Sequence, residues 1–164
     1  MKETTITKDQ KQLTIVRDFD APVEQVWRAW TERSLLDLWW APQPWKAATK
    51  SMDFREGGTW LYAMEGPGGE EHWSKADFET INPRKRYTGR DAFCDENGNV
   101  SGEMPGMHWD VSFASVGGGT RVTILITFAS EEDLNKIVEM GFKEGFTEAH
   151  GNLDELLARG AQNQ

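Results

Sequence analysis

Between residues 45 and 128, apolar and polar residues alternate in one short segment after another, and glycine-rich turns separate these segments. A period of two is typical of a strand that buries one face. Antiparallel sheets commonly have one solvated face. The sequence therefore predicts an antiparallel sheet of six strands here, whose apolar side includes Trp60, Tyr62, Met64, Ala76, Phe78, Met107, Trp109, Val111, Phe113, Val122, Ile124, Ile126 and Phe128.

The segments on either side of this sheet predict one more strand and the helices. Residues 13–19 alternate as a strand, and Asp20-Ala21-Pro22 is typical of a helix start. Two short amphipathic helices follow and end near Pro42. At the other end, Ser130 caps a long helix that closes at Gly160. Its apolar positions are Leu134, Ile137, Val138, Phe142, Phe146, Leu153, Leu156 and Leu157.

Small residues recur every four positions along the predicted long helix, at Gly141, Gly145 and Ala149. Glycine inside a helix costs about 1 kcal/mol relative to alanine, so two glycines need a local reason. One interpretation is close packing of sheet backbone on the helix, and the other is an empty lane above it. With helices collected at the ends of one long sheet, we predict an α+β fold and one domain over residues 1–164, with an ordered core of about residues 10–160.

Charge and cysteine content narrow the classes of partner. The formal net charge is -9, and an acidic surface repels phosphate backbones and anionic lipid. We therefore expect neither a nucleic-acid nor a membrane partner. One cysteine, Cys94, excludes an internal disulfide, and no segment has the length of a signal peptide or a membrane span. These features indicate a cytoplasmic protein.

An ordered set of short motifs resembles a known family. The set begins with Asp20-Ala21-Pro22, Val26-Trp27, Thr31, Leu36 and Trp39-Trp40, and continues with Arg55–Trp60, Ile81-Asn82-Pro83 with Arg86, Gly141-Phe142, and Gly145-Phe146 leading to Leu153. It is similar to AHSA-type proteins, relatives of the C-terminal domain of the activator of the ninety-kilodalton heat-shock protein ATPase. These belong to the START/polyketide-cyclase (SRPBCC) superfamily, which shares the fold of the birch pollen allergen. The resemblance implies a helix-grip fold, in which a curved sheet wraps around a long C-terminal helix.

Three polar residues are candidates for a ligand site. Arg17 shares strand parity with the apolar residues around it, so it either forms a structural ion pair or anchors an acidic ligand. In the second case, Arg17→Leu abolishes binding of acidic ligands and spares the fold. His72 shares parity with Ala76 and Phe78, and it either lines the wall or rim of the interior or shuttles protons. His150 replaces an apolar residue expected from the family, and it either presents a polar tip to the cavity or lies at the edge.

Large apolar residues complete the candidate lining. An apolar pocket with a few polar groups is the default small-molecule site, although ordinary core residues show the same alternation. We predict that the cavity opens near the loop of residues 95–106. The predicted lining consists of Trp60, Tyr62, Phe78, Trp109, Phe113, Phe142 and Phe146.

No motif points to catalysis, a metal or a cofactor. His108 and Asp110 lie on the face opposite Trp109, so we expect both in solvent. Three scattered histidines and one cysteine give no zinc spacing, and Gly117-Gly118-Gly119 lacks the lysine of a phosphate loop. No nucleophile, base and orienting group occur together. We therefore lean against an enzyme.

Three functions remain open. The first is binding of a small hydrophobic molecule, with an acidic or phenolic group, in a cavity of at least a few hundred cubic ångströms. The second is a protein-interaction module, such as a chaperone regulator, with a filled interior and an exposed apolar patch at Trp39, Trp40 and Trp45. The third is a cyclase-like or dehydratase-like enzyme, for which Arg17 and His72 are the only candidates.

Overall fold

The computed structural model describes residues 4–100 and 106–162. Its eight strands form one antiparallel sheet in the order β1-β2-β8-β7-β6-β5-β4-β3. Every strand from β3 onward therefore pairs with its neighbour along the chain, and β2 closes against β8. The strands are β1 (Thr5–Asp9), β2 (Gln12–Phe19), β3 (Lys46–Met52), β4 (Thr59–Glu65), β5 (Glu71–Asn82), β6 (Arg86–Cys94), β7 (Met107–Val116) and β8 (Gly119–Phe128).

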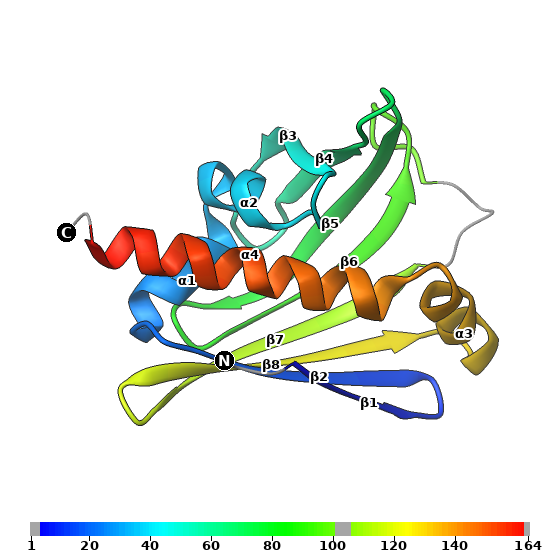
Figure 1. The fold of residues 1–164 in the computed structure, drawn as a ribbon. Helices are drawn as coiled ribbons and strands as arrows, with labels where there is room; N and C mark the ends of the chain where they lie inside the picture. The colour runs from blue at the N-terminus through cyan, green and yellow to red at the C-terminus, as the bar shows by residue number, and fades with distance from the viewer. Residues whose placement is uncertain (1–3, 101–105, 163–164) are drawn as a thin grey trace.

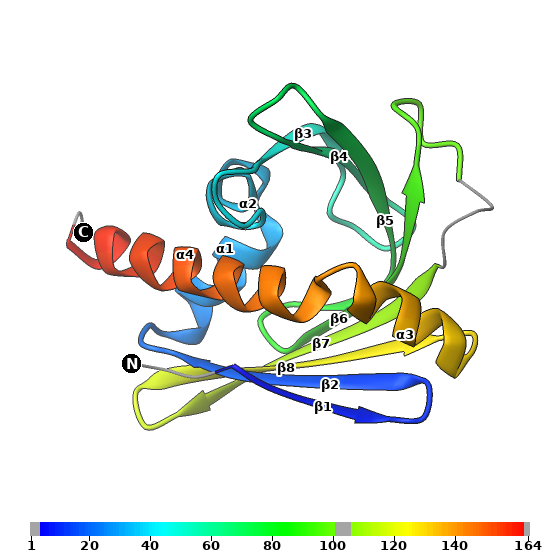
Figure 2. The same cartoon turned by 45° about the vertical axis from the view of Figure 1, so that its right-hand side comes forward.

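Four helices in the described part of the chain accompany the sheet: α1 (Val23–Thr31), α2 (Arg33–Trp39), α3 (Glu131–Glu139) and α4 (Phe142–Gln162). Both views show α4 crossing the concave side of the curved sheet, with α1 and α2 near one end of α4 and α3 at the other (Figures 1 and 2). This arrangement confirms the predicted α+β helix-grip fold. No helix among the described residues is long and apolar enough to cross a membrane.

The sequence did not predict strand β1. This strand begins at Thr5, before the expected start of the ordered core near residue 10. Strand β1 pairs with β2 through a turn at Gln10, whose φ is 54°. As an edge strand it leaves nearly all its side chains in solvent, and only Ile6 packs on the core. An exposed edge strand has no apolar face to alternate, so the sequence gives no period-two signal.

The predicted long C-terminal helix is two helices. Gly141 has a φ of 93° and stands between α3 and α4. A left-handed backbone ends a helix, and glycine adopts it without steric cost. The apolar periodicity continues across the break because both helices face the same sheet. Ser130 does cap α3, since its side chain accepts a hydrogen bond from the backbone of Asp133.

Gly141→Ala should lower the free energy of unfolding by about 1–2 kcal/mol, because an L-residue is strained at this φ. Gly151 is the matched control within α4: it is exposed, its φ is not positive, and a Cβ there would meet nothing within 4 Å. Gly151→Ala should therefore raise stability by about 0.5–1 kcal/mol. Urea unfolding of both variants measures the two changes, and equal effects of the two substitutions would contradict the assigned break.

A dense aromatic core lies between α1, α2 and the sheet. Trp30 and Trp39 are almost fully buried, with ring centroids 4.9 Å apart, and Trp39 Nε1 donates to the carbonyl oxygen of Ala29 at 2.9 Å. Trp40 is only 7% exposed. The prediction of an exposed patch at Trp39 and Trp40 is therefore wrong, because these rings fill the layer between the short helices and the sheet.

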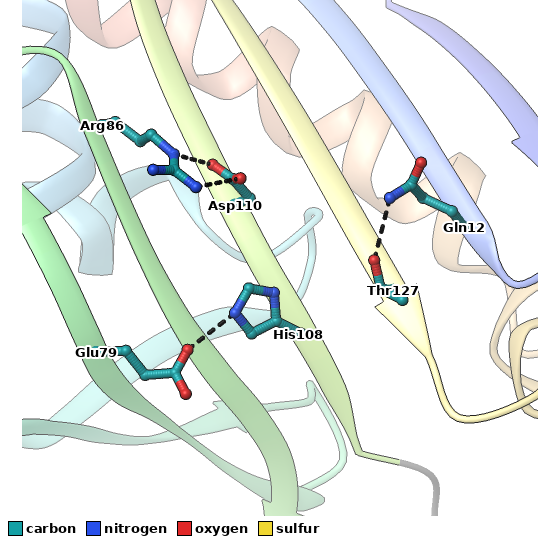
Figure 3. Close-up of polar contacts among 6 residues, drawn as sticks. All are labelled: Gln12, Glu79, Arg86, His108, Asp110 and Thr127. Atoms are coloured by element: carbon teal, nitrogen blue, oxygen red, sulfur yellow. Dashed lines mark hydrogen bonds and ion pairs between the residues drawn. The ribbon is translucent and has the colours of Figure 1, made fainter.

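The outer face of the sheet is polar. His108 Nε2 lies 2.8 Å from Glu79 Oε1, and Arg86 donates to both carboxylate oxygens of Asp110 at 2.8 and 2.7 Å (Figure 3). His108 and Asp110 thus lie on the outer face as expected. Asp110 pairs with the neighbouring strand β6, and His108 reaches across β6 to β5. Exposed side-chain pairs of this kind are typical of a solvated surface.

Candidate ligand-binding cavity

A cavity of about 310 Å³ lies between the sheet and the first turns of α4. The α2–β3 connection, β4 to β7, the end of α3 and the start of α4 all contribute to its wall. Residues 92, 93 and 107 place it beside the loop 95–106, of which residues 101–105 lie outside the described part. Its lining comprises Trp40, Pro42, Trp45, Tyr62, Met64, His72, Ser74, Asp91, Ala92, Phe93, Met107, Trp109, Ile137, Met140, Gly141, Phe142, Gly145 and Phe146.

The two glycines explain why there is space beneath the helix. A Cβ on Gly141 would meet nothing within 4 Å, and one on Gly145 would lie 3.5 Å from Pro42 Cγ, an ordinary contact. Neither glycine is needed for close approach of sheet backbone. Both line the cavity, so the empty-lane interpretation describes them better than the packing interpretation.

Tyr62 brings a hydroxyl group to the cavity wall. It accepts a hydrogen bond from Trp40 Nε1 at 3.0 Å, and Ser74, its cross-strand partner in β5, also hydrogen-bonds to it. Burial raises the pKa of Tyr62 above its ordinary value, so the phenol stays protonated at neutral pH. Trp109 Nε1 is a further donor, since it is buried without a hydrogen-bond partner among the described residues.

Among the described residues, Asp91 is the acidic residue of the lining, and sequence reasoning missed it. It lies on β6 opposite Ala76 of β5 and Met107 of β7, on the apolar side of the sheet. Burial, and secondarily the charge of Asp77, raises the pKa of Asp91 to about 8. The sequence did contain a signal for the inward orientation of Asp91, because Asp91 shares strand parity with Tyr87 and Phe93.

Five of the predicted site residues meet at this cavity: Tyr62, His72, Trp109, Phe142 and Phe146. The rings of Phe142 and Phe146 stack at 5.3 Å, and Phe146 meets Trp109 edge-on at 5.7 Å. His72 is exposed and lies 5.3 Å from the Trp45 ring, which places it at the rim.

Three predicted lining residues lie in the packed core outside this cavity. Trp60 donates to Thr49 Oγ1 at 3.0 Å, and its ring stacks on Tyr62 at 4.1 Å. Phe78 packs on Phe54, and Phe113 packs on Trp27. All three of Trp60, Phe78 and Phe113 face inward as their alternation indicates, which shows that parity alone does not separate a cavity wall from core.

Arg17 also points inward but does not line the cavity. Its Nη2 forms an ion pair with Asp154 of α4, and its Nη1 donates to the carbonyl oxygen of Asp18 at 2.8 Å. The guanidinium lies over the Phe19 ring, 5.0 Å from its centroid. Of the two interpretations of Arg17, the geometry therefore matches the structural ion pair. This ion pair joins β2 to α4.

His150 is fully buried, so the prediction that it lies at the edge is wrong. It is also outside the lining, enclosed by the rings of Phe19, Trp30, Trp39 and Phe146. Its Nδ1 lies 3.1 Å from Thr4 Oγ1. Burial, and secondarily the charge of Arg17, lowers the pKa of His150 to about 3, so this imidazole is neutral at pH 7.

A family model matches residues 20–158, and its description is Activator of Hsp90 ATPase homolog 1-like protein. The chain belongs to this family. Among solved structures, an Arthrobacter aurescens protein is 35% identical over 94% of this chain and 91% of its own, with a TM-score of 0.88. Protein Ms6760 of Mycobacterium smegmatis is 31% identical over 94% and 96%, also with a TM-score of 0.88.

Another solved structure is more distant. The AHSA1 protein of Silicibacter pomeroyi is 16% identical, with a TM-score of 0.71 over 91% of this chain and 99% of its own, which shows a common fold alone. No curated protein matches the sequence. The family assignment confirms the resemblance. Within residues 4–100 and 106–162, no group of three His, Cys, Asp or Glu residues is placed to hold a metal ion.

Proposed function

We propose that this chain binds a small hydrophobic molecule in the cavity beneath α4. The observation that supports it most is a mainly apolar, largely aromatic cavity of about 310 Å³ at a place where the helix carries glycine. Ligand pockets span about 300–1,000 Å³, and an engineered cavity of about 150 Å³ holds benzene. The ligand is therefore about the size of a substituted single ring or a short branched chain.

The competing functions have less support from the geometry. The interaction-module hypothesis required a filled interior and an exposed tryptophan patch, whereas Trp39 and Trp40 are buried. The enzyme hypothesis depended on Arg17 and His72. Arg17 pairs with Asp154, and His72 is exposed at the rim of the cavity. The family name refers to a chaperone activator, and that activity stays an alternative for this chain. One domain over residues 1–164 and a cytoplasmic location also remain part of the proposal.

Gly145→Leu should fill the cavity and reduce binding of apolar ligands at least about tenfold, because the new side chain occupies the space next to Pro42. Gly151→Leu places the same side chain on the exposed side of α4 and should leave affinity unchanged. Amide and methyl NMR shifts during titration with a panel of neutral aromatic and fatty compounds measure the binding.

The wild-type shifts should cluster on Tyr62, Trp109, Phe142 and Phe146. Absence of shifts across the neutral panel would reject binding of neutral apolar ligands, and failure of charged ligands of the same size as well would favour the interaction-module alternative. Equal loss of affinity in both leucine variants would show that the helix, rather than the cavity, had been perturbed.

A further inference from the structure

The carboxyl group of Asp91 has no partner in the part of the chain that the structure describes. Neither an ion pair nor a hydrogen bond joins it to residues 4–100 or 106–162. The nearby cations are engaged on the outer face of the sheet, where Lys75 pairs with Asp77 and Arg90 with Glu79. A carboxyl group placed among apolar walls without a counter-ion is costly when ionised, and a bound cation would remove this cost.

The side chains around Asp91 are of a kind that binds cations. Aromatic faces attract a cationic group within about 6 Å of the ring centroid, and tryptophan is the strongest in this respect. The cavity lining contains three tryptophans, Trp40, Trp45 and Trp109, together with Tyr62 and two stacked phenylalanines. Apolar ligands alone do not require this combination of tryptophans and one unpaired acid.

Charge on the other lining elements agrees with this chemistry. The part of α3 and α4 that lines the cavity carries only apolar residues, and β7 contributes Met107 and Trp109. Among the described residues, the titratable groups that face Asp91 are Tyr62 of β4, Tyr87 of β6 and, at the rim, His72 of β5, with Asp77 acting from the outer face. Arg17, the anchor expected for an acidic ligand, lies outside the lining and is paired with Asp154.

We propose that the ligand is a hydrophobic cation, an ammonium group on an aromatic or branched apolar body, whose charge is bound by Asp91 and the tryptophan-rich wall. This inference rests on the proposed function and narrows it to a class of ligand. It replaces the acidic or phenolic ligand expected from the sequence. The net charge of -9 also raises the local concentration of cations at the protein surface.

Benzyltrimethylammonium and neopentylbenzene test the proposal, because they have the same shape and differ in charge. Wild-type protein should bind the ammonium compound at least about tenfold more tightly than the hydrocarbon. Asp91→Asn should lose this preference and bind neopentylbenzene as well as the wild type does. Asp95→Asn is the control, since Asp95 is an exposed acid outside the cavity lining and should keep the preference.

A second readout follows from the protonation of Asp91. Because burial keeps its pKa near 8, Asp91 is mostly protonated at pH 7, and binding of the quaternary ammonium ion should release close to one proton. Calorimetry in buffers of different ionisation enthalpy counts the protons, and Asp91→Asn should abolish the release.

The outcomes separate the two proposals. Binding of neopentylbenzene with equal or weaker binding of the ammonium compound overturns the cation inference and leaves the hydrophobic-ligand function standing. Failure of both compounds, together with failure of the neutral panel, overturns both. A preference for the ammonium compound that survives in Asp91→Asn overturns the role of Asp91.

Discussion

Asp154→Ala should lower the free energy of unfolding by about 3 kcal/mol, because it leaves the Arg17 guanidinium buried without its carboxylate. Arg17 is only 4% exposed, and its Nε already has no partner among the described residues. Arginine cannot neutralise itself by losing a proton, so the charge remains inside the protein. We expect this loss of stability to lie at the lower end of the range for broken buried ion pairs, because the Asp154 side chain is 35% exposed. Chemical denaturation measures it.

The second arm of this experiment removes both charges. The double variant Arg17→Met with Asp154→Ala should recover to within about 1 kcal/mol of the wild type, since a buried ion pair can be replaced by apolar residues at little cost. Asp110→Ala, which removes the carboxylate of an exposed Arg86 pair, should cost less than about 1 kcal/mol. A double variant no more stable than Asp154→Ala would show that Arg17 contributes chiefly through its packing on Phe19.

His150 should make the protein less stable in mild acid. Its pKa in the folded state is about 3 against an ordinary value of 6.5, so the unfolded chain takes up a proton below pH 6.5 that the folded protein does not bind. Stability from this group is complete above pH 6.5 and falls as the pH drops towards 3. Between pH 7 and pH 5 the loss is about 2 kcal/mol.

The measurement is the difference between variants, because Asp91 acts in the opposite direction over the same range. Its folded pKa is raised to about 8, so its ionisation opposes folding as the pH increases. His150→Leu should remove the acid-linked loss, and thermal unfolding at pH 5, 6 and 7 should show the gap to wild type changing by about 2 kcal/mol. A parallel pH profile for His150→Leu would contradict the assigned burial.

The sequence predicted the fold well because the fold depends on repeated local patterns. The alternation of Trp109, Val111 and Phe113, and the spacing of Leu134, Phe146 and Leu153, report which side of a strand or helix is buried. The misses have local causes. Strand β1 lies at an edge and buries little, and the helix break depends on the conformation of a single residue, Gly141.

The site was predicted only in part because inward-facing parity does not measure empty volume. Tyr62 and Phe78 show the same alternation, yet Tyr62 lines the cavity and Phe78 packs against Phe54. The partner of Arg17 lies 137 residues away on α4, so no local pattern could identify it. Asp91 was visible as an acid on an apolar face, and it is this kind of local contradiction that points to a site.

The cavity has two walls of different character. The helical wall leaves room because Gly141 and Gly145 carry no side chains, whereas the strands and the α2–β3 connection supply the hydroxyl, carboxyl and indole groups. The volume of the cavity and its polar groups therefore depend on separate segments of the chain. A substitution at position 145 changes the volume of the cavity and leaves its polar groups in place. A substitution at position 91 changes the polarity of the cavity and leaves its volume nearly the same. Relatives with this architecture can diversify in these two respects independently, one residue at a time.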